Sequence, residues 1–368
     1  MNDIFLIDDK KYTYQDLILF LNVDQIDESF SETVLGVFKF IKKLVPNKIN
    51  SIEELVHRIQ TSDENIDLYT SGTTSKPKKI THTIKTLSKN IKIKDDLTNV
   101  TWGLTYHPEK MASIQVILQA IYNYSTIVNL FGIPNKEIIN RIKNLNVTHI
   151  SATPTFYKLL MSSGDIFDSV NQITLGGEGS ENSLIESIRK CFPNAKVKNI
   201  YASSEASALF ASETNIFKIP KKIENLIKIV DGVLFLHRDL LGKDFSELNL
   251  TDNWYDTQDL VTMLPNNEFK FIGRKNLEIN ISGYKVNPIK IESIINGLPF
   301  IINNVVYSKK NSVTGNLLYC DIILKDKSIT KATIKKTLSS LIEKHEIPSI
   351  INFVDTLKTN ENNKISRI

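Results

Sequence analysis

Small and hydroxylated residues are concentrated just before a basic run in residues 68–82, which read LYTSGTTSKPKKITH. Glycine and small side chains let backbone N–H groups approach an anion, and the hydroxyl groups between Thr70 and Thr74 add further donors. The lysines that follow supply positive charge. The stretch therefore has the chemistry of a phosphate-binding loop. A solvated linker is the alternative, because clusters of Ser, Thr and Gly also form linkers.

The spacing in this loop excludes the Walker type of phosphate loop. A Walker loop needs a glycine directly before its lysine and a hydroxyl residue directly after it. Here Gly72 is the only glycine, and Pro77 separates two lysines. The loop therefore predicts phosphate binding outside the P-loop NTPase class.

Charge and cysteine content exclude several other classes. The 368 residues carry 45 Lys and Arg against 41 Asp and Glu, with both signs interspersed, so we expect no nucleic-acid partner. Two cysteines are too few for a disulfide framework and favour a reducing compartment. The start MNDIFLIDDKK lacks the pattern of a signal peptide, and no apolar run reaches membrane-spanning length. These features predict a cytoplasmic protein without a membrane span.

Helices and strands are expected to alternate around the loop. Ser51 stands three residues before Glu54, a capping-box pattern that predicts a helix, and a strand should end near Tyr69. Further on, VTHISA predicts a buried strand, followed by a helix with Thr153 as N-cap and Pro154 in its first turn. This alternation predicts an α/β fold.

The same order of elements returns after residue 170. QITLGG predicts a strand, SENSLIESIRKCF a helix and AKVKNIYA another strand, with Gly176, Gly177 and Gly179 at the carboxyl end of the first. Ligands of open α/β sheets bind at such strand ends.

The pattern changes near residue 277. LEINISGYKVNP predicts a strand and turn, and it is followed by a short helix, two strands around SVTGN, a helix over residues 329–345 and a terminal strand. Mixed strands and helices over this length predict a small α+β domain. We therefore expect residues 1–275 to form a large α/β domain and residues 276–368 a small one.

Taken in order, five segments resemble the adenylate-forming superfamily, which contains acyl-CoA synthetases, the adenylation domains of peptide synthetases, and luciferases. The segments are YTSGTTSKPKK, IYASSEAS, WYDTQDL, GRKNLEINISGYKVNPIKIE and NENNKISR. They resemble the family's phosphate loop, its YGxTE and YxTGD segments, its hinge segment and its terminal NGKIDR segment. Five matches in the family's order are far more specific than one, and the chain is similar to a short acyl-CoA ligase-like member.

The chain also departs from the family pattern. Several usual glycines, and two usually basic hinge-segment positions, carry other residues; these replacements are Ser75, Lys79, Ala202, Gln258, Asn280 and Lys285. Only 67 residues precede the loop, although KKYTYQDLILFLN is similar to the family's opening segment. We therefore expect a reshaped nucleotide pocket and a first subdomain that is partly missing.

The resemblance implies roles for the loop and for the YGxTE-like segment. The loop residues would contact the β- and γ-phosphates of ATP; they are Thr70, Ser71, Gly72, Thr73, Thr74 and Lys78. Glu205 would hold Mg²⁺, and Ser204 would bind a phosphate oxygen. Thr70 and Glu205 would thereby act in catalysis.

Nucleoside contacts follow from the same resemblance. Tyr201 would stack on adenine, or could belong to the core, while Gly176, Gly177 and Glu178 would line the edge of the base. Asp259 would accept hydrogen bonds from the ribose hydroxyls, and Arg274 would reach the ribose or a phosphate. The alternative for this last pair is a structural salt bridge.

Three further residues are implied by family position. Lys364 corresponds to the catalytic lysine, with a disordered tail lysine as the alternative. Asn276 corresponds to the hinge around which family members rotate the small domain between half-reactions. His107 stands where peptide-synthetase domains place an aspartate and acyl-CoA ligases often carry histidine, so it would act at the substrate, or serve only the structure.

The implied reaction joins a small carboxylic acid to ATP, giving acyl-AMP and pyrophosphate, after which a thiol such as coenzyme A displaces AMP. A first alternative is loading of the acyl group onto the phosphopantetheine of an acyl carrier protein. A second is a nucleotide-binding protein that has lost catalysis.

Overall fold

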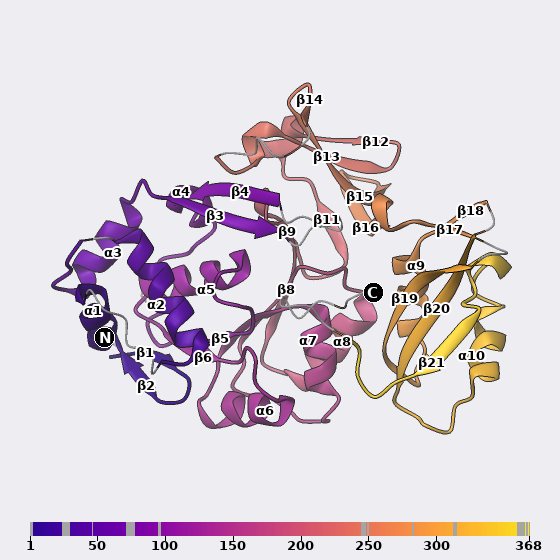
Figure 1. Ribbon diagram of the computed structural model, residues 1–368, viewed down its shortest axis with the longest axis horizontal. Helices are drawn as coiled ribbons and strands as arrows, with labels where there is room; N and C mark the ends of the chain where they lie inside the picture. The colour runs from indigo at the N-terminus through magenta and orange to yellow at the C-terminus, as the bar shows by residue number, and fades with distance from the viewer. Residues whose placement is uncertain are drawn as a thin grey trace.

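A parallel sheet lies at the centre of the large domain (Figure 1), in the order β10-β9-β8-β7-β5-β6-β1-β2. The computed structural model describes residues 3–23, 30–45, 47–70, 78–94, 97–243, 248, 250–281, 283–311, 315–358, 365 and 367. The strands from β9 to β1 run parallel, and antiparallel β10 and β2 close the two edges. The strands are β1 (Ile4–Ile7), β2 (Lys11–Thr13), β5 (Thr101–Leu104), β6 (Thr126–Asn129), β7 (His149–Ala152), β8 (Gln172–Leu175), β9 (Lys196–Ser203) and β10 (Ser207–Ser212).

Helices between these strands form where the predicted caps stand. Ser51 Oγ accepts the N–H of Glu54, and Thr153 Oγ1 accepts the N–H of Phe156, so both helices begin as expected. The large domain contains α1 (Tyr14–Asn22), α2 (Glu32–Leu44), α3 (Ile52–Gln60), α4 (Ile84–Leu87), α5 (Met111–Tyr122), α6 (Asn135–Asn144), α7 (Pro154–Met161) and α8 (Asn182–Cys191).

The segment before the loop joins the same core. Tyr14 begins α1 and is buried, and its hydroxyl donates to the Ser125 carbonyl 2.9 Å away. Arg141 of α6 donates to Asp8 Oδ1 at 2.9 Å and so ties the turn after β1 to the sheet. Helices α1, α2 and α3 thus occupy one end of the large domain (Figure 1).

Next to the central sheet lie a β-hairpin and a second antiparallel sheet. Strands β3 (Asn65–Thr70) and β4 (Lys78–Thr83) form the hairpin that carries the predicted loop. The second sheet has the order β11-β16-β15-β13-β12, with β14 paired to β15. Its strands are β11 (Ile216–Lys218), β12 (Ile227–Val230), β13 (Val233–His237), β14 (Leu250–Thr251), β15 (Trp254–Leu264) and β16 (Glu268–Arg274), and the 3₁₀ helices η2 (Lys221–Leu226) and η3 (Arg238–Leu240) accompany them.

The small domain follows the short 3₁₀ helix η4 (Lys275–Leu277) and has its own apolar core. Its elements are β17 (Ile279–Ile281), β18 (Tyr284–Val286), α9 (Pro288–Asn296), β19 (Ile301–Asn311), β20 (Gly315–Leu324), α10 (Lys331–Leu338), η5 (Lys344–Glu346) and β21 (Ile350–Phe353). Strand β20 pairs with both β19 and β21. The predicted combination of a large α/β domain and a small α+β domain is confirmed.

One predicted helix is shorter than expected. The pattern of residues 329–345 predicted a continuous helix, but α10 ends at Leu338. The hydroxyls of Ser339 and Ser340 donate back to the carbonyls of Lys336 and Thr337, at 2.7 and 2.8 Å. Serine competes with the helical hydrogen-bond ladder in this way, which explains the early end. Among the described residues, none of the helices has the length and apolarity needed to cross a membrane.

Candidate active site

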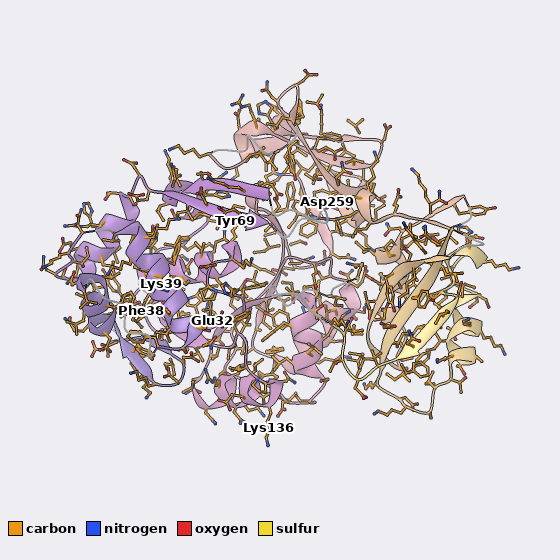
Figure 2. The ribbon with its side chains drawn as sticks, viewed as in Figure 1. Glu32, Phe38, Lys39, Tyr69, Lys136 and Asp259 are labelled. Carbon is orange, nitrogen blue, oxygen red and sulfur yellow. The ribbon has the colours of Figure 1, made fainter. Side chains whose placement is uncertain are left out.

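Asp259 lies at the centre of a polar cluster on the second sheet, where Figure 2 labels it. Strand pairing sets Asp259 opposite Arg274, and Arg274 Nε donates to Asp259 Oδ1 over 2.7 Å. The hydroxyl of Tyr201, from β9, donates to Asp259 Oδ2. The Asp259 side chain is 4% exposed and that of Arg274 43% exposed. Both carboxylate oxygens therefore have partners, and the salt bridge considered from the sequence is present.

The electrostatics of this cluster follow from its burial. Removal from water raises the pKa of Asp259, while Arg274 and Tyr201 oppose that rise. Burial and the neighbouring carboxylate likewise raise the pKa of Tyr201 well above its ordinary value, so its phenol stays protonated and donates. The Tyr201 ring packs against Phe210 and Phe217, with centroids 5.5 and 6.4 Å away. Tyr201 thus belongs both to the core and to the polar cluster.

Gln258, which stands at a usual glycine position of the family, lies within β15 directly before Asp259. Gln258 has φ +61°, in the left-handed region, and its N–H donates to Asp256 Oδ1 at 2.8 Å. A residue with a Cβ loses about 1–2 kcal/mol in this conformation. Gln258 therefore holds a strained backbone conformation that glycine would adopt without strain.

Glu205 lies in the turn between β9 and β10, and the hydroxyl of Tyr255 donates to its Oε1 at 3.3 Å. Burial, followed by the Glu205 charge, raises the pKa of Tyr255, which therefore remains a donor. Glu205 also opposes the ionisation of Asp259 through its charge, so the two carboxylates share one electrostatic environment. The predicted metal ligand and the predicted ribose acceptor are thus brought together.

His82 of β4 fastens the hairpin to this turn. Its Nε2 donates to the Ser204 carbonyl at 2.7 Å, and burial lowers the pKa of the ring. Gly242 closes the junction, because its N–H donates to the Glu205 carbonyl at 2.9 Å. A Cβ at Gly242 would lie 2.9 Å from the Thr81 carbonyl, so only glycine fits without movement.

The glycines after β8 lie at the carboxyl end of that strand, as expected. Gly177 has φ +81°, a conformation that favours glycine, whereas a Cβ on Gly176 would meet only the Ile200 carbonyl at 3.7 Å. Glu178 Oε2 accepts the backbone N–H and the hydroxyl of Thr155, at 3.1 and 2.7 Å. Because Thr155 is in the first turn of α7, the Glu178 carboxylate caps a helix whose N-terminus favours negative charge.

The C-terminal tail reaches the same residue. The N–H of Ile365 donates to Glu178 Oε1 at 3.3 Å. Two residues on, Arg367 forms an ion pair with Glu292 of α9 at 2.6 Å. Lys364, which precedes Ile365 in the chain, lies outside the described residues, so its predicted role stays a prediction.

Most of the predicted phosphate loop also lies outside the described residues. Ser71, Gly72, Thr73 and Thr74 belong to that part. Thr70 ends β3 and Lys78 begins β4, but only their backbone is described. The side chain of Lys79, which stands at a usual glycine position, pairs with Asp67 at 3.1 Å. Tyr69, labelled in Figure 2, is 59% exposed.

His107 has contacts of a structural kind. Its ring lies edge-on to Phe131, with centroids 5.6 Å apart, and its Nε2 is 3.8 Å from Glu32 Oε1. Figure 2 shows Glu32 on α2, away from Asp259. These contacts are those of a structural histidine, and the role of His107 at the substrate stays a prediction.

The described residues contain no group of three or more His, Cys, Asp or Glu side chains that could form a metal cage. A single carboxylate is nevertheless a suitable site for Mg²⁺, which usually binds one or two protein carboxylates and completes its shell with phosphates and water. Glu205, half-buried in a turn and hydrogen-bonded by one phenol, fits that kind of ligand.

Sequence reasoning did not single out His82, Tyr255, Thr155 or Lys158. His82 had a signal, because β4 alternates and buries Ile80 and His82 on one face. Tyr255 stood within a segment already recognised. No sequence signal pointed to Thr155 or Lys158, because their hydrogen-bond partners, Glu178 and Asn303, lie on other parts of the fold.

Comparison with known proteins gives matches along most of the chain. The model of the AMP-binding enzyme family matches residues 26–231, and that of the AMP-binding enzyme C-terminal domain matches residues 290–364. Bacitracin synthase 3 of Bacillus licheniformis is 24% identical over 86% of this chain, which spans 6% of that protein. The D-alanine–D-alanyl carrier protein ligase of Streptococcus pneumoniae is 24% identical over 85% of this chain and 71% of its own length.

The fold is shared with a solved structure. O-succinylbenzoate coenzyme A synthetase from Bacillus subtilis, in complex with ATP and magnesium ion, superposes with a TM-score of 0.68 at 17% identity, over 100% of this chain and 96% of the other. Since the first family model covers more than half of the residues, the chain belongs to the AMP-binding enzyme family.

Proposed function

We propose that the protein activates a small carboxylic acid with ATP and passes the acyl group to a thiol. In the first step a carboxylate oxygen attacks the α-phosphorus, the bond to the β-phosphate oxygen breaks, and pyrophosphate leaves. In the second, the thiol sulfur attacks the acyl carbon, the bond to the phosphate oxygen breaks, AMP leaves, and the thiol proton passes to water. Membership of the AMP-binding enzyme family supports this reaction, as do relatives named as a coenzyme A synthetase and a carrier protein ligase.

The observation that carries the proposal is the polar cluster of Tyr201, Glu205, Tyr255, Asp259 and Arg274. It combines carboxylates with a guanidinium and two phenols from β9, the turn after β9, β15 and β16. Adenylation builds charge on phosphate oxygens, and fixed donors and a metal ion stabilise such charge. Strand β4, which follows the predicted phosphate loop in the chain, is held to the turn of Glu205 by the hydrogen bond from His82 to the Ser204 carbonyl.

Within this proposal Glu205 holds Mg²⁺, which would neutralise charge on the phosphates. Asp259 accepts the ribose hydroxyls by exchanging its contact with Tyr201, which frees the tyrosine ring to face the base. Arg274 stays with Asp259 and presents its exposed part to the ribose or a phosphate. Lys364 bridges the carboxylate and the phosphate when the small domain is docked, and the domain boundary at residues 275 and 276 supplies the hinge.

The test is pyrophosphate exchange into ATP across a panel of carboxylic acids, with magnesium present. Exchange that depends on one acid supports adenylation. The absence of exchange with every acid, in a protein that binds ATP, would contradict it and favour the degenerate alternative, in which strain at Gln258 and the lost glycines have ended catalysis.

The second half-reaction has two candidates. Coenzyme A is the first, and an acyl carrier protein is the second, favoured by the carrier protein ligase among the relatives. Incubation of the preformed acyl-AMP with coenzyme A alone, and then with a phosphopantetheinylated carrier, distinguishes them by which one releases AMP. The proposal also places the protein in the cytoplasm, consistent with the free thiols of Cys191 and Cys320.

A further inference from the structure

Lys158 of α7 reaches across from the large domain to the small one. Its Nζ donates to Asn303 Oδ1 of β19 at 3.0 Å. Figure 1 shows α7 beside β19, at the side of the large domain that faces the small domain. The side chain is neither predicted from any family motif nor part of the polar cluster around Asp259.

The partner of Lys158 belongs to a fixed network inside the small domain. Asn303 is 1% exposed, and its Oδ1 also accepts the N–H of Asn304 at 3.0 Å. The Asn304 side chain donates to the Glu292 carbonyl at 2.9 Å. The Glu292 carboxylate in turn accepts the Val306 N–H at 2.8 Å and pairs with Arg367 of the tail. Asn303 is therefore linked through hydrogen bonds to helix α9, whose Glu292 binds the C-terminal tail.

The large-domain end of this chain of contacts is Glu178. It accepts the Ile365 N–H and caps α7 through Thr155, one turn before Lys158. Lys158 thus lies within electrostatic reach of Glu178 in its own domain and of Glu292 in the small domain, and Glu292 pairs with Arg367. Burial lowers the pKa of Lys158 to about 8, while Glu178, Glu292 and Glu181 oppose that shift. An ammonium group that met only solvent would not be perturbed in this way.

We propose that Lys158 is a positioning residue that holds the small domain in the orientation in which its tail contacts Glu178, and that it thereby supports acyl-AMP formation but not thiol transfer. The inference rests on the proposed two-step function. It differs from the role of Lys364, because Lys158 acts through Asn303 and not on the reacting atoms.

The first experiment replaces Lys158 by Met, which keeps the length of the chain and removes the charge. Pyrophosphate exchange should fall about tenfold or more, the scale of a lost hydrogen bond to a charged group. Transfer from chemically supplied acyl-AMP to the thiol should stay within about twofold of the unmodified protein. Lys136→Met is the matched control, since Lys136 is an exposed large-domain lysine on α6, far from the small domain in Figure 2. Equal loss of both half-reactions in Lys158→Met would overturn the proposal.

A second substitution, expected to strengthen docking rather than weaken it, makes the test more specific. Asn303→Asp keeps the shape and places a carboxylate against the Lys158 ammonium, so it should strengthen docking, preserve exchange and slow thiol transfer. In the double variant with Lys158→Met this slowing should disappear. If Asn303→Asp slows transfer equally with and without Lys158, the two residues are not coupled and the proposal fails.

Domain orientation can also be measured without any reaction. Spin labels at Lys136→Cys and Lys327→Cys, with Cys191→Ser, report one distance across the domains; Cys320 is buried, and Lys327 is 86% exposed. The Lys158→Met substitution should shift population from the docked distance to a second one. An unchanged distribution would overturn the positioning role. This readout stands even if no acid supports exchange, so failure of the proposed function and failure of this inference are distinguishable.

Discussion

The polar cluster around Asp259 and the contacts between the two domains are built differently. Asp259 and Arg274 come from two paired strands and Tyr201 from the neighbouring central sheet of the same domain, and the carboxylate is 4% exposed. The interdomain contacts Lys158–Asn303 and Glu178–Ile365 are single hydrogen bonds between a side chain and a neighbour on a separate unit. The first region is organised before any ligand arrives, while the second can be broken and remade during a reaction cycle. Four predictions test this difference.

The largest effect should come from removing Asp259. The Asp259→Ala variant leaves the Arg274 guanidinium and the Tyr201 hydroxyl without their shared acceptor. Breaking a buried pair costs about 3–5 kcal/mol, and the partial exposure of Arg274 favours the lower end, about 3 kcal/mol. Chemical denaturation measures the loss, together with weakened ATP binding. Asp168→Ala, at an exposed position, serves as control. A loss below about 1 kcal/mol would mean that the cluster is not pre-organised.

Glu205 should matter for the reaction rather than for the fold. Glu205→Gln removes one negative charge at nearly constant volume, and the Tyr255 hydroxyl can still donate to the amide oxygen. Exchange activity should fall by about 10²-fold, the scale of a lost electrostatic contact in the transition state. Thermal unfolding should change little. Exchange within a few-fold of the unmodified protein would exclude the metal role, and titration with Mg²⁺ should show weaker binding in the variant.

A smaller effect is expected from pH on the docked population. In the docked state burial lowers the pKa of Lys158 from its ordinary value of 10.5 to about 8. Undocking that exposes the ammonium should return this pKa towards 10.5, so between these values the docked state binds fewer protons. The docked fraction should therefore rise as the pH rises from 8 towards 10.5, and it should be insensitive to this group below that window. The charged groups around the ammonium are Glu178 after β8, Glu181 before α8 and Glu292 on α9. Spin-label distances at successive pH values measure the fraction, and Lys158→Met should flatten the curve.

The smallest effect concerns Gln258. Gln258→Gly relieves the left-handed strain, about 1–2 kcal/mol, but makes the unfolded chain more flexible by about 1 kcal/mol. The net change in unfolding free energy should be between zero and about 1 kcal/mol of stabilisation, read by denaturation. A lower unfolding free energy of Gln258→Gly would show instead that the Gln258 side chain makes contacts that outweigh the strain of its backbone. Exchange activity of this variant also tells whether the missing glycine limits the reaction.

Local signals were enough to predict much of the large domain. Ser51 and Thr153 cap helices where the sequence pattern placed them, and the strand containing QITL ends in the expected glycines. Across the β15–β16 hairpin, even the pairing of Asp259 with Arg274 could be anticipated as an alternative. These features depend on neighbours in the chain or across one hairpin, so the sequence carries them directly.

The contacts between distant elements could not be predicted in this way. Lys158 meets Asn303 after 145 residues, and His82 meets Ser204 after 122. Such pairs depend on how sheets and domains pack, which no local pattern encodes. The early end of α10 is a different case. Here Ser339 and Ser340 did give a local signal for the end of the helix, but the sequence prediction gave more weight to the apolar periodicity of the segment.

The junction at Gly242 has a consequence for which substitutions the protein tolerates. Three stretches of chain that are far apart in sequence meet there: β4, the turn of Glu205, and the segment after η3. Because a side chain at this position would collide with the Thr81 carbonyl, even alanine must push β4 away from the turn. One methyl group at Gly242 would thus displace strand β4 and the turn that carries the carboxylate proposed for magnesium relative to each other.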